Sequence, residues 1–479
     1  MSHIETDYLV IGAGALGMAF TDSLIAQSDA HVVIVDRHAK PGGHWNVAYP
    51  YVTLHQPSAT YGINSRDLDD DRKDASGPNA GLYALATGTQ VRDYFEAAMR
   101  EAFLPSGQVS YHPMSDYTAG EGGEHRFRSI MGGGETRVTV RRKVVDGRDF
   151  TARVPATEKR KFAVADGVRV ATPGDLPRLW LDPEFAAPSQ YVVLGAGKTA
   201  MDAATWLLQM GVAPGAIAWV RPRETWMINR LATQPGADFV KHTVDWQLHQ
   251  MLAAAEAQSA DDIFLALEER GHMLRLDTER LPTKFVFPTI AGSEVDMLRT
   301  IANVIRIGRI ERVEPGRLIG AEGEASIAED ALLVDCTASA APRQPVEPIW
   351  QPGRIVPQLL QVPLVSLSAA VTGHIEATFP DDDAAKNAVA MPAQITDSPA
   401  HYPQALLNNA MNRMLWSQNE ALSGWLAQQR LDPGARIARV IGGADAETKK
   451  AAMRIREATV AAVPNLQKLA MQAQQAEAA

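Results

Sequence analysis

The first 17 residues contain the pattern that most constrains the fold of this chain. An apolar run over residues 8–11 leads into Gly12-x-Gly14-x-x-Gly17, and a helix is expected from about residue 16 to residue 27. In such a unit the first glycine permits a tight turn, the second admits a pyrophosphate, and the third lets the helix pack on the strand. The helix start adds free N–H groups. The pattern predicts a dinucleotide site that includes Gly12, Gly14, Ala15, Leu16 and Gly17.

The next apolar run, residues 31–35, ends in Asp36, about 20 residues after Gly17. A carboxylate at this place accepts hydrogen bonds from a ribose diol and repels a 2′-phosphate. We therefore expect an adenosine without a 2′-phosphate, as in FAD, beside Asp36 and its neighbour Arg37.

The same pattern returns in the middle of the chain, where residues 191–194 precede Gly195-x-Gly197-x-x-Ala200. Here the following strand ends in Arg221, which attracts the 2′-phosphate that an aspartate repels. Two nucleotides that exchange electrons are commonly a flavin and a nicotinamide, so we assign this site to NADPH. A P-loop is excluded, because position 192, where that motif needs glycine, is valine. The residues expected at this site are Gly195, Gly197, Lys198, Thr199, Ala200, Arg221 and Arg223.

The composition limits the partners and the compartment. The 479 residues carry a formal net charge of −10, which argues against a nucleic-acid or anionic-membrane surface. Cys336 is the only cysteine, which excludes an intramolecular disulfide and a dithiol–disulfide reductase. The chain has no apolar run of about 18 residues and no signal-peptide pattern at its start. We expect a cytoplasmic protein without a membrane span, and the oligomeric state stays open, a homo-oligomer included.

The order of the expected elements predicts an α/β fold with two Rossmann-like dinucleotide domains and a helical C-terminal region. An antiparallel meander over residues 109–111, 125–130 and 136–145 is expected inside the first domain. Strands at 162–171 and 331–338 are also expected to belong to that domain. The predicted segments are 1–182 and 316–400 for the FAD-binding domain, 183–315 for the NADPH-binding domain, and 401–479 for the helical region.

These motifs, together with Gly42-Gly43-His44-Trp45, resemble the two-dinucleotide flavoprotein monooxygenases of the flavin-containing, N-hydroxylating and Baeyer–Villiger types. The resemblance implies that Gly43, His44 and Trp45 lie along FAD and that Thr337 touches it again. It also implies that NADPH reduces FAD, that O₂ then forms a flavin peroxide, and that one oxygen passes to a small organic substrate. The candidates to line the reacting ring are His55, Gln56, Tyr61 and Asn64, each of which could instead be a structural polar residue.

Two departures from this family keep other functions open. The F-x-G-x-x-x-H-x-x-x-F/Y motif is missing between residues 150 and 191, and the late strand ends in Cys336-Thr337-Ala338 where Ala-Thr-Gly is usual. An FAD- and NADPH-dependent reductase without oxygen insertion is one alternative, and a redox sensor without turnover is another. A metal site built from His38, His44 and His55 is not expected, because no carboxylate accompanies them at ligand spacing.

Overall fold

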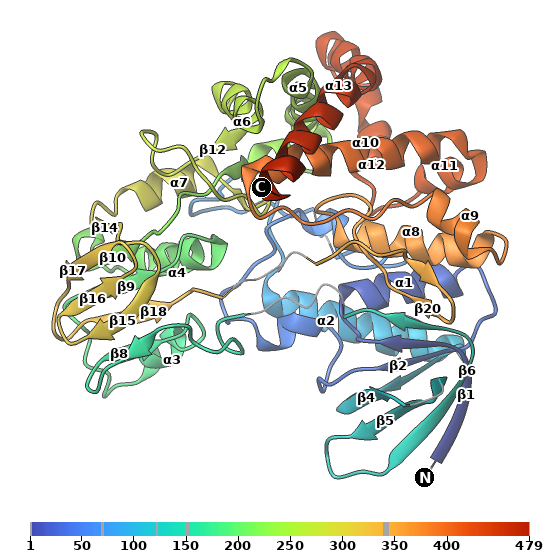
Figure 1. Ribbon diagram of the computed structural model, residues 1–479, viewed down its shortest axis with the longest axis horizontal. Helices are drawn as coiled ribbons and strands as arrows, with labels where there is room; N and C mark the ends of the chain where they lie inside the picture. Colours follow the sequence, from blue (N-terminus) through green and yellow to red (C-terminus); the bar gives the residue numbers. More distant parts are fainter. Residues whose placement is uncertain (1, 69–70, 121–122, 149–153, 339–343, 479) are drawn as a thin grey trace.

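The computed structural model describes residues 2–68, 71–120, 123–148, 154–338 and 344–478 (Figure 1). In the view of Figure 1 one parallel sheet lies at the lower right, a second lies at the left, and helices from the second half of the chain form the top. The predicted α/β fold with two Rossmann-like units and a helical C-terminal region is confirmed.

The first sheet is built around the N-terminal strand. It contains β1 (Ser2–Ile11), β2 (Val32–Val35), β3 (Val109–His112), β6 (Glu135–Asp146), β19 (Trp350–Gln351) and β20 (Arg354–Ile355), and α1 (Ala15–Ile25) follows β1. The strand order is β19-β20-β6-β1-β2-β3. β1 pairs in parallel with β2 and β6, so that Ile11 stands opposite Val35 and Asp146. The carboxyl ends of three strands therefore meet at one edge, where the glycine turn begins.

The antiparallel insertion consists of β4 (Ser115–Ala119) and β5 (His125–Ser129), which pair with each other, and β5 also pairs with β6. The prediction that residues 109–111 belong to this meander is wrong. These residues form β3, which pairs in parallel with β2 and completes the nucleotide-binding sheet. Met114, with a φ of +50°, lies in the short turn that separates β3 from β4.

The second sheet contains β8 (Arg169–Ala171), β9 (Tyr191–Leu194), β10 (Ile217–Val220), β14 (Val304–Ile305) and β18 (Leu332–Asp335). Its order is β14-β10-β9-β18-β8, and every pair is parallel. Helices α3 (Leu176–Leu181), α4 (Lys198–Gln209) and α7 (Gly292–Arg299) belong to the same unit.

The membership of β8 and β18 corrects the predicted domain assignment. Both strands were expected in the first unit, but β18 pairs with β9 and β8 along its length. An apolar run such as Leu332–Val334 fits any buried parallel strand, so its pattern does not specify the partner. The boundaries predicted at 182/183 and 315/316 divide this sheet, and we propose residues 162–336 for the second unit.

Two smaller sheets and the remaining helices complete the fold. One sheet contains β7 (Ala163–Val164), β15 (Ile310–Glu314), β16 (Arg317–Gly320) and β17 (Gly323–Ser326). The other contains β11 (Met227–Asn229), β12 (Met273–Leu274) and β13 (Thr289–Ile290). The helices are α2 (Gly88–Ala98), α5 (Val240–Glu256), α6 (Ala260–Glu269), α8 (Val365–Thr378), α9 (Asp383–Ala388), α10 (Tyr402–Gln418), α11 (Glu420–Leu426), α12 (Pro433–Val440) and α13 (Ala446–Ala478).

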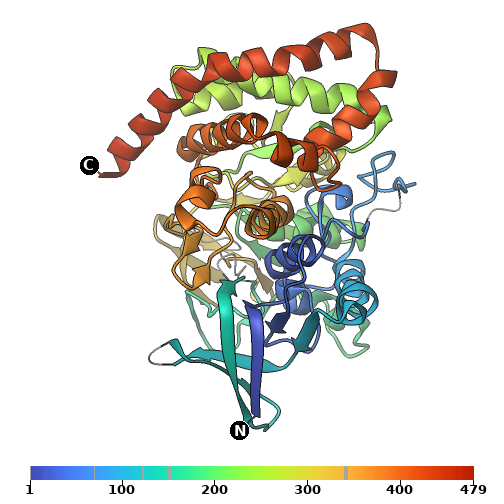
Figure 2. The same ribbon diagram turned by 90° about the vertical axis from the view of Figure 1, so that its right-hand side faces the viewer.

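The C-terminal helices join the two units from above. α8 packs closely along α1, where a Cβ on Gly373 would overlap the carbonyl oxygen of Phe20. α13 lies along α5 and α10 (Figure 2). Among the helices that the structure describes, none combines the length and apolar character needed to cross a membrane.

Candidate functional site

The first glycine turn is tightly packed. Gly12 has a φ of +100°, which favours glycine, and a Cβ on Gly17 would overlap the carbonyl oxygen of Gly12. α1 starts at Ala15, and its first backbone hydrogen bond runs from Met18 N to Gly14 O (2.9 Å). The N–H groups of Ala15, Leu16 and Gly17 therefore have no intrahelical acceptor and can bind an anion.

Asp36 lies beside this turn and is buried. One carboxylate oxygen, Oδ2, accepts a hydrogen bond from Ala13 N at 2.6 Å, and the other, Oδ1, accepts one from His38 N at 2.7 Å. The carboxylate is thus held at the end of β2 with acceptor capacity left for a ribose. The predicted neighbour Arg37 is exposed, and its side chain forms an ion pair with Asp116 of β4 (2.6 Å).

The Gly-Gly-His-Trp segment closes over the turn. Gly42 N donates to Ala13 O (2.8 Å), and a Cβ on Gly43 would lie 3.0 Å from the Cα of Gly14. Trp45 is buried in the short helix Gly43–Val47, and its indole N–H donates to the Tyr61 hydroxyl at 2.8 Å. Burial lowers the pKa of His44 to about 4, so this imidazole is neutral at pH 7.

The loop after this segment reaches the second unit. Tyr49 donates to Asp202 of α4 at 2.6 Å, and the Tyr51 ring stacks on Trp206 of the same helix with 5.2 Å between ring centres. Burial, followed by the nearby Lys198 charge, lowers the pKa of His55 to about 4. The loop therefore brings a neutral imidazole close to the start of α4.

The other predicted catalytic residues are spread along the loop. Gln56 is half-buried. Tyr61 is buried against Trp45, whereas Asn64 lies against the C-terminal half of α1, with Nδ2 at 3.5 Å from Ser23 Oγ. Asn64 Oδ1 is buried, and no described residue donates a hydrogen bond to it. Tyr61 is thus placed with the glycine-turn residues, whereas Asn64 is held farther along α1.

The second glycine turn resembles the first. Gly195 has a φ of +119°, and a Cβ there would lie 3.1 Å from the Cys336 carbonyl oxygen. α4 begins at Lys198 and places Thr199 and Ala200 in its first turn. The Lys198 ammonium forms ion pairs with Asp202 and Glu294, so its charge is already balanced within the protein. Thr337 hydrogen-bonds to Asp335 (2.7 Å between the Thr337 hydroxyl and Asp335 Oδ1) at the end of β18, in the second unit.

Cations gather around this second turn. Arg221 is buried over the Trp219 ring and pairs with Glu224, with 3.5 Å between Nη1 and Oε2. Its Nε has no hydrogen-bond partner among the residues that the structure describes. A Cβ on Gly197 would lie 3.7 Å from the Lys284 ammonium. Burial, and then the charge of Arg223, lower the pKa of Lys284, while the Asp397 carboxylate opposes this shift. Within the described part of the chain, the Lys284 ammonium has no hydrogen-bond or ion-pair partner.

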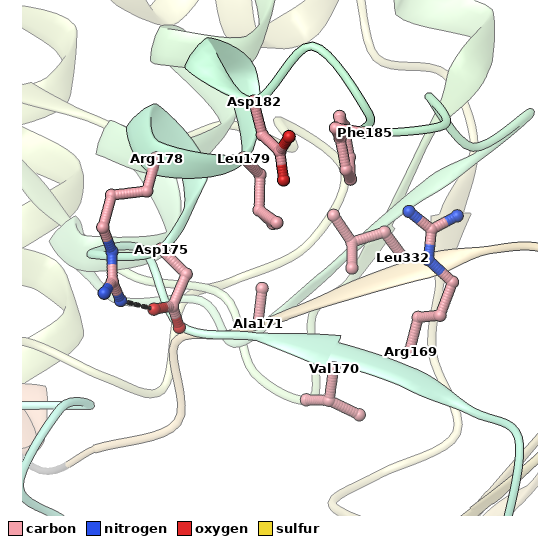
Figure 3. Close-up of a pocket in the computed structure, with 9 residues that line it drawn as sticks. All are labelled: Arg169, Val170, Ala171, Asp175, Arg178, Leu179, Asp182, Phe185 and Leu332. Carbon is pink, nitrogen blue, oxygen red and sulfur yellow. Dashed lines mark hydrogen bonds and ion pairs between the residues drawn. The ribbon is translucent and has the colours of Figure 1, made fainter.

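Several of these residues were missed from the sequence. Lys284 and Asp202 come from distant segments, and no local motif marks them. A cavity of about 460 Å³ also lies elsewhere, between edge strand β8 and α3 (Figure 3). None of the predicted site residues lines it. Its walls are Arg169, Val170, Ala171, Asp175, Arg178, Leu179, Asp182, Phe185 and Leu332.

Comparisons with known proteins give sequence relatives and a shared fold, and no family model matches the chain. The chain is 39% identical over 429 residues to the uncharacterized protein Rv2000 of Mycobacterium tuberculosis (strain ATCC 25618 / H37Rv). The matched region covers 90% of this chain and 78% of that protein. The uncharacterized protein Mb2023 of Mycobacterium bovis matches over the same length with the same identity. Among solved structures, the polycyclic ketone monooxygenase of Thermothelomyces thermophila has a TM-score of 0.51 at 12% identity, with 99% of this chain and 88% of that chain covered.

Proposed function

Because this chain belongs to the same family as the mycobacterial proteins Rv2000 and Mb2023, and has the fold of the flavoprotein monooxygenases, we propose that it is an FAD- and NADPH-dependent monooxygenase. Its substrates are a small organic molecule and O₂. The fold alone does not define a reaction, so the proposal depends on the two sites.

The opposite charge of the two turns is the observation that carries this proposal. The first turn presents the buried carboxylate of Asp36. The second has the cations Arg221, Arg223, Lys284 and Arg309 nearby. Arg221 is paired with Glu224 (3.5 Å), and Asp397 is the carboxylate that acts on the Lys284 charge, although it forms no direct ion pair with it among the described residues. Burial lowers the pKa of Lys284, and a phosphate beside its ammonium and the Arg221 guanidinium would favour the charged form of the lysine. FAD fits the first site and NADPH the second.

The residues of the first site would hold FAD by its pyrophosphate, its ribose and its ring system. The free N–H groups at the start of α1 suit the pyrophosphate, Asp36 suits the ribose, and Gly43 with Trp45 suits the approach of the ring system. When bound, the two nucleotides would supply hydride transfer and oxygen activation.

The protein residues would position the reactants and exclude water. Trp45 and Tyr61 form a rigid aromatic wall, because they are joined by a hydrogen bond and packed edge to face at 6.1 Å. The link from Tyr49 to Asp202 holds the loop across both units. His55 is neutral, so it can donate one ring N–H to a substrate oxygen and accept a proton at the other nitrogen.

The reaction of the reduced protein with O₂ tests this function. The purified protein is reduced with NADPH without air and is then mixed with oxygenated buffer while absorbance is recorded. A monooxygenase shows a transient absorbing species distinct from oxidised and reduced flavin, and the species persists until a substrate is added. Direct return to oxidised flavin with release of hydrogen peroxide would favour the reductase alternative instead.

A further inference from the structure

We propose that Arg430, between α11 and α12, is a positioning residue that holds the aromatic wall of the first nucleotide site. By this wall we mean Trp45 and Tyr61. The inference rests on the proposed FAD site, because it assumes that Trp45 faces the flavin. It extends the site to the C-terminal helical region, which no motif connects with nucleotide binding.

The Arg430 side chain binds the loop through three carbonyl oxygens. Its Nε donates to Ile63 O (2.8 Å), Nη1 to Ala59 O (2.8 Å) and Nη2 to Tyr61 O (2.6 Å). Nη2 also lies 3.2 Å from the Tyr94 hydroxyl. The three carbonyls belong to alternate residues, so the planar guanidinium fixes the path of the whole segment 59–63.

Arg430 is buried, so its charge must be satisfied by hydrogen bonds within the protein. The residue is 7% exposed, and the nearest ion-pair oxygen, Asp67 Oδ1, is 3.6 Å from Nε on a side chain that is 70% exposed. A buried charge is tolerated when hydrogen bonds satisfy it, and here backbone carbonyls provide most of them. Lysine offers a point charge and cannot satisfy three separated carbonyls in one plane.

Two further steps connect Arg430 to the glycine turn. The backbone that it binds carries the Tyr61 ring, whose hydroxyl accepts the Trp45 indole N–H at 2.8 Å. Trp45 lies in the helix that begins at Gly43, and Gly43 packs against Gly14 of the first turn. Loss of the guanidinium would free the loop and, through Tyr61, release Trp45.

The matched control is Arg413 in the same helical region. It forms a two-pronged ion pair with Asp432 at 2.8 Å for both contacts, and it lies over the Trp416 ring. Asp432 lies two residues after Arg430, so Arg413→Lys loosens the same inter-helix turn while it leaves the bonds from the Arg430 guanidinium to the loop carbonyls in place. Both lysine variants are compared with the wild type by hydrogen–deuterium exchange of residues 57–66 in the flavin-free protein, and by the Kd for FAD.

We expect Arg430→Lys to speed exchange in residues 57–66 and to raise the Kd for FAD about tenfold, the effect of losing one or two hydrogen bonds. Arg413→Lys should change neither. Tyr61→Phe should raise the Kd similarly and change the visible circular dichroism of bound FAD in the same way. The double variant should be no worse than either single variant.

Unchanged exchange and unchanged FAD affinity in Arg430→Lys would overturn the proposal. Additive effects of Arg430→Lys and Tyr61→Phe would overturn it as well. If Arg430→Lys does not fold, a Tyr61→Phe protein with wild-type FAD affinity and dichroism rejects the proposal by itself. A wild-type protein that binds no FAD would instead refute the proposed function, while the exchange experiment still measures the hold of Arg430 on the loop.

Discussion

Two alanine substitutions in the first glycine turn should have different effects: Gly17→Ala should lower stability, whereas Gly14→Ala should weaken flavin binding. At Gly17 a Cβ would overlap the backbone oxygen of Gly12, which cannot move aside as a flexible side chain would. We expect Gly17→Ala to lose about 3 kcal/mol of unfolding free energy, the upper part of the range for overpacking. At Gly14 the added Cβ would lie 3.5 Å from the Cα of Gly43, which is ordinary contact.

Gly14 also has φ −83° and ψ −172°, which alanine adopts without strain. Gly14→Ala should therefore unfold at the wild-type temperature or slightly above it, because the substitution reduces the freedom of the unfolded chain. Its methyl group would block the approach of a pyrophosphate. The loss of two hydrogen bonds to a charged group, about 1.5 kcal/mol each, weakens FAD about 100-fold. Thermal melts and the flavin content after purification test this contrast, and a yellow Gly14→Ala protein with full flavin would refute the assignment of the turn.

Three other substitutions test Arg221, Cys336 and His374 separately. Arg221→Ala should raise the KM for NADPH roughly 10- to 100-fold with little effect on NADH, as expected for one lost charged hydrogen bond; equal effects on both would reject the phosphate role. Cys336→Ser should keep its turnover, because burial raises the pKa of this thiol and holds it protonated, and inactivity in a folded variant would contradict this. Burial lowers the pKa of His374 to about 4, so below pH 6.5 the folded state binds fewer protons than the unfolded state. The free energy of unfolding should therefore fall as the pH is lowered from 6.5 to 4, by up to about 3 kcal/mol. In chemical denaturation at several pH values, His374→Gln should show a shallower loss.

The sequence predicted what depends on local geometry. The two glycine turns and the acidic end of β2 follow from short-range spacing, and Asp36 lies where that spacing places it. The partners of β18 could not be predicted, because a buried parallel strand has the same apolar sequence pattern whichever sheet it joins. Arg430 lies more than 360 residues from the carbonyls that it binds, so nothing near it in the sequence marks its role.

Two nucleotides of different charge are expected to bind the two turns and to exchange electrons. The most direct measurement is an anaerobic stopped-flow reduction of the purified protein, with NADPH and NADH compared at several concentrations. We expect a protein that carries FAD, and NADPH should bleach the visible absorbance of this flavin at a much lower concentration than NADH does. A protein with no FAD, or a bound flavin that NADPH does not bleach, would contradict it.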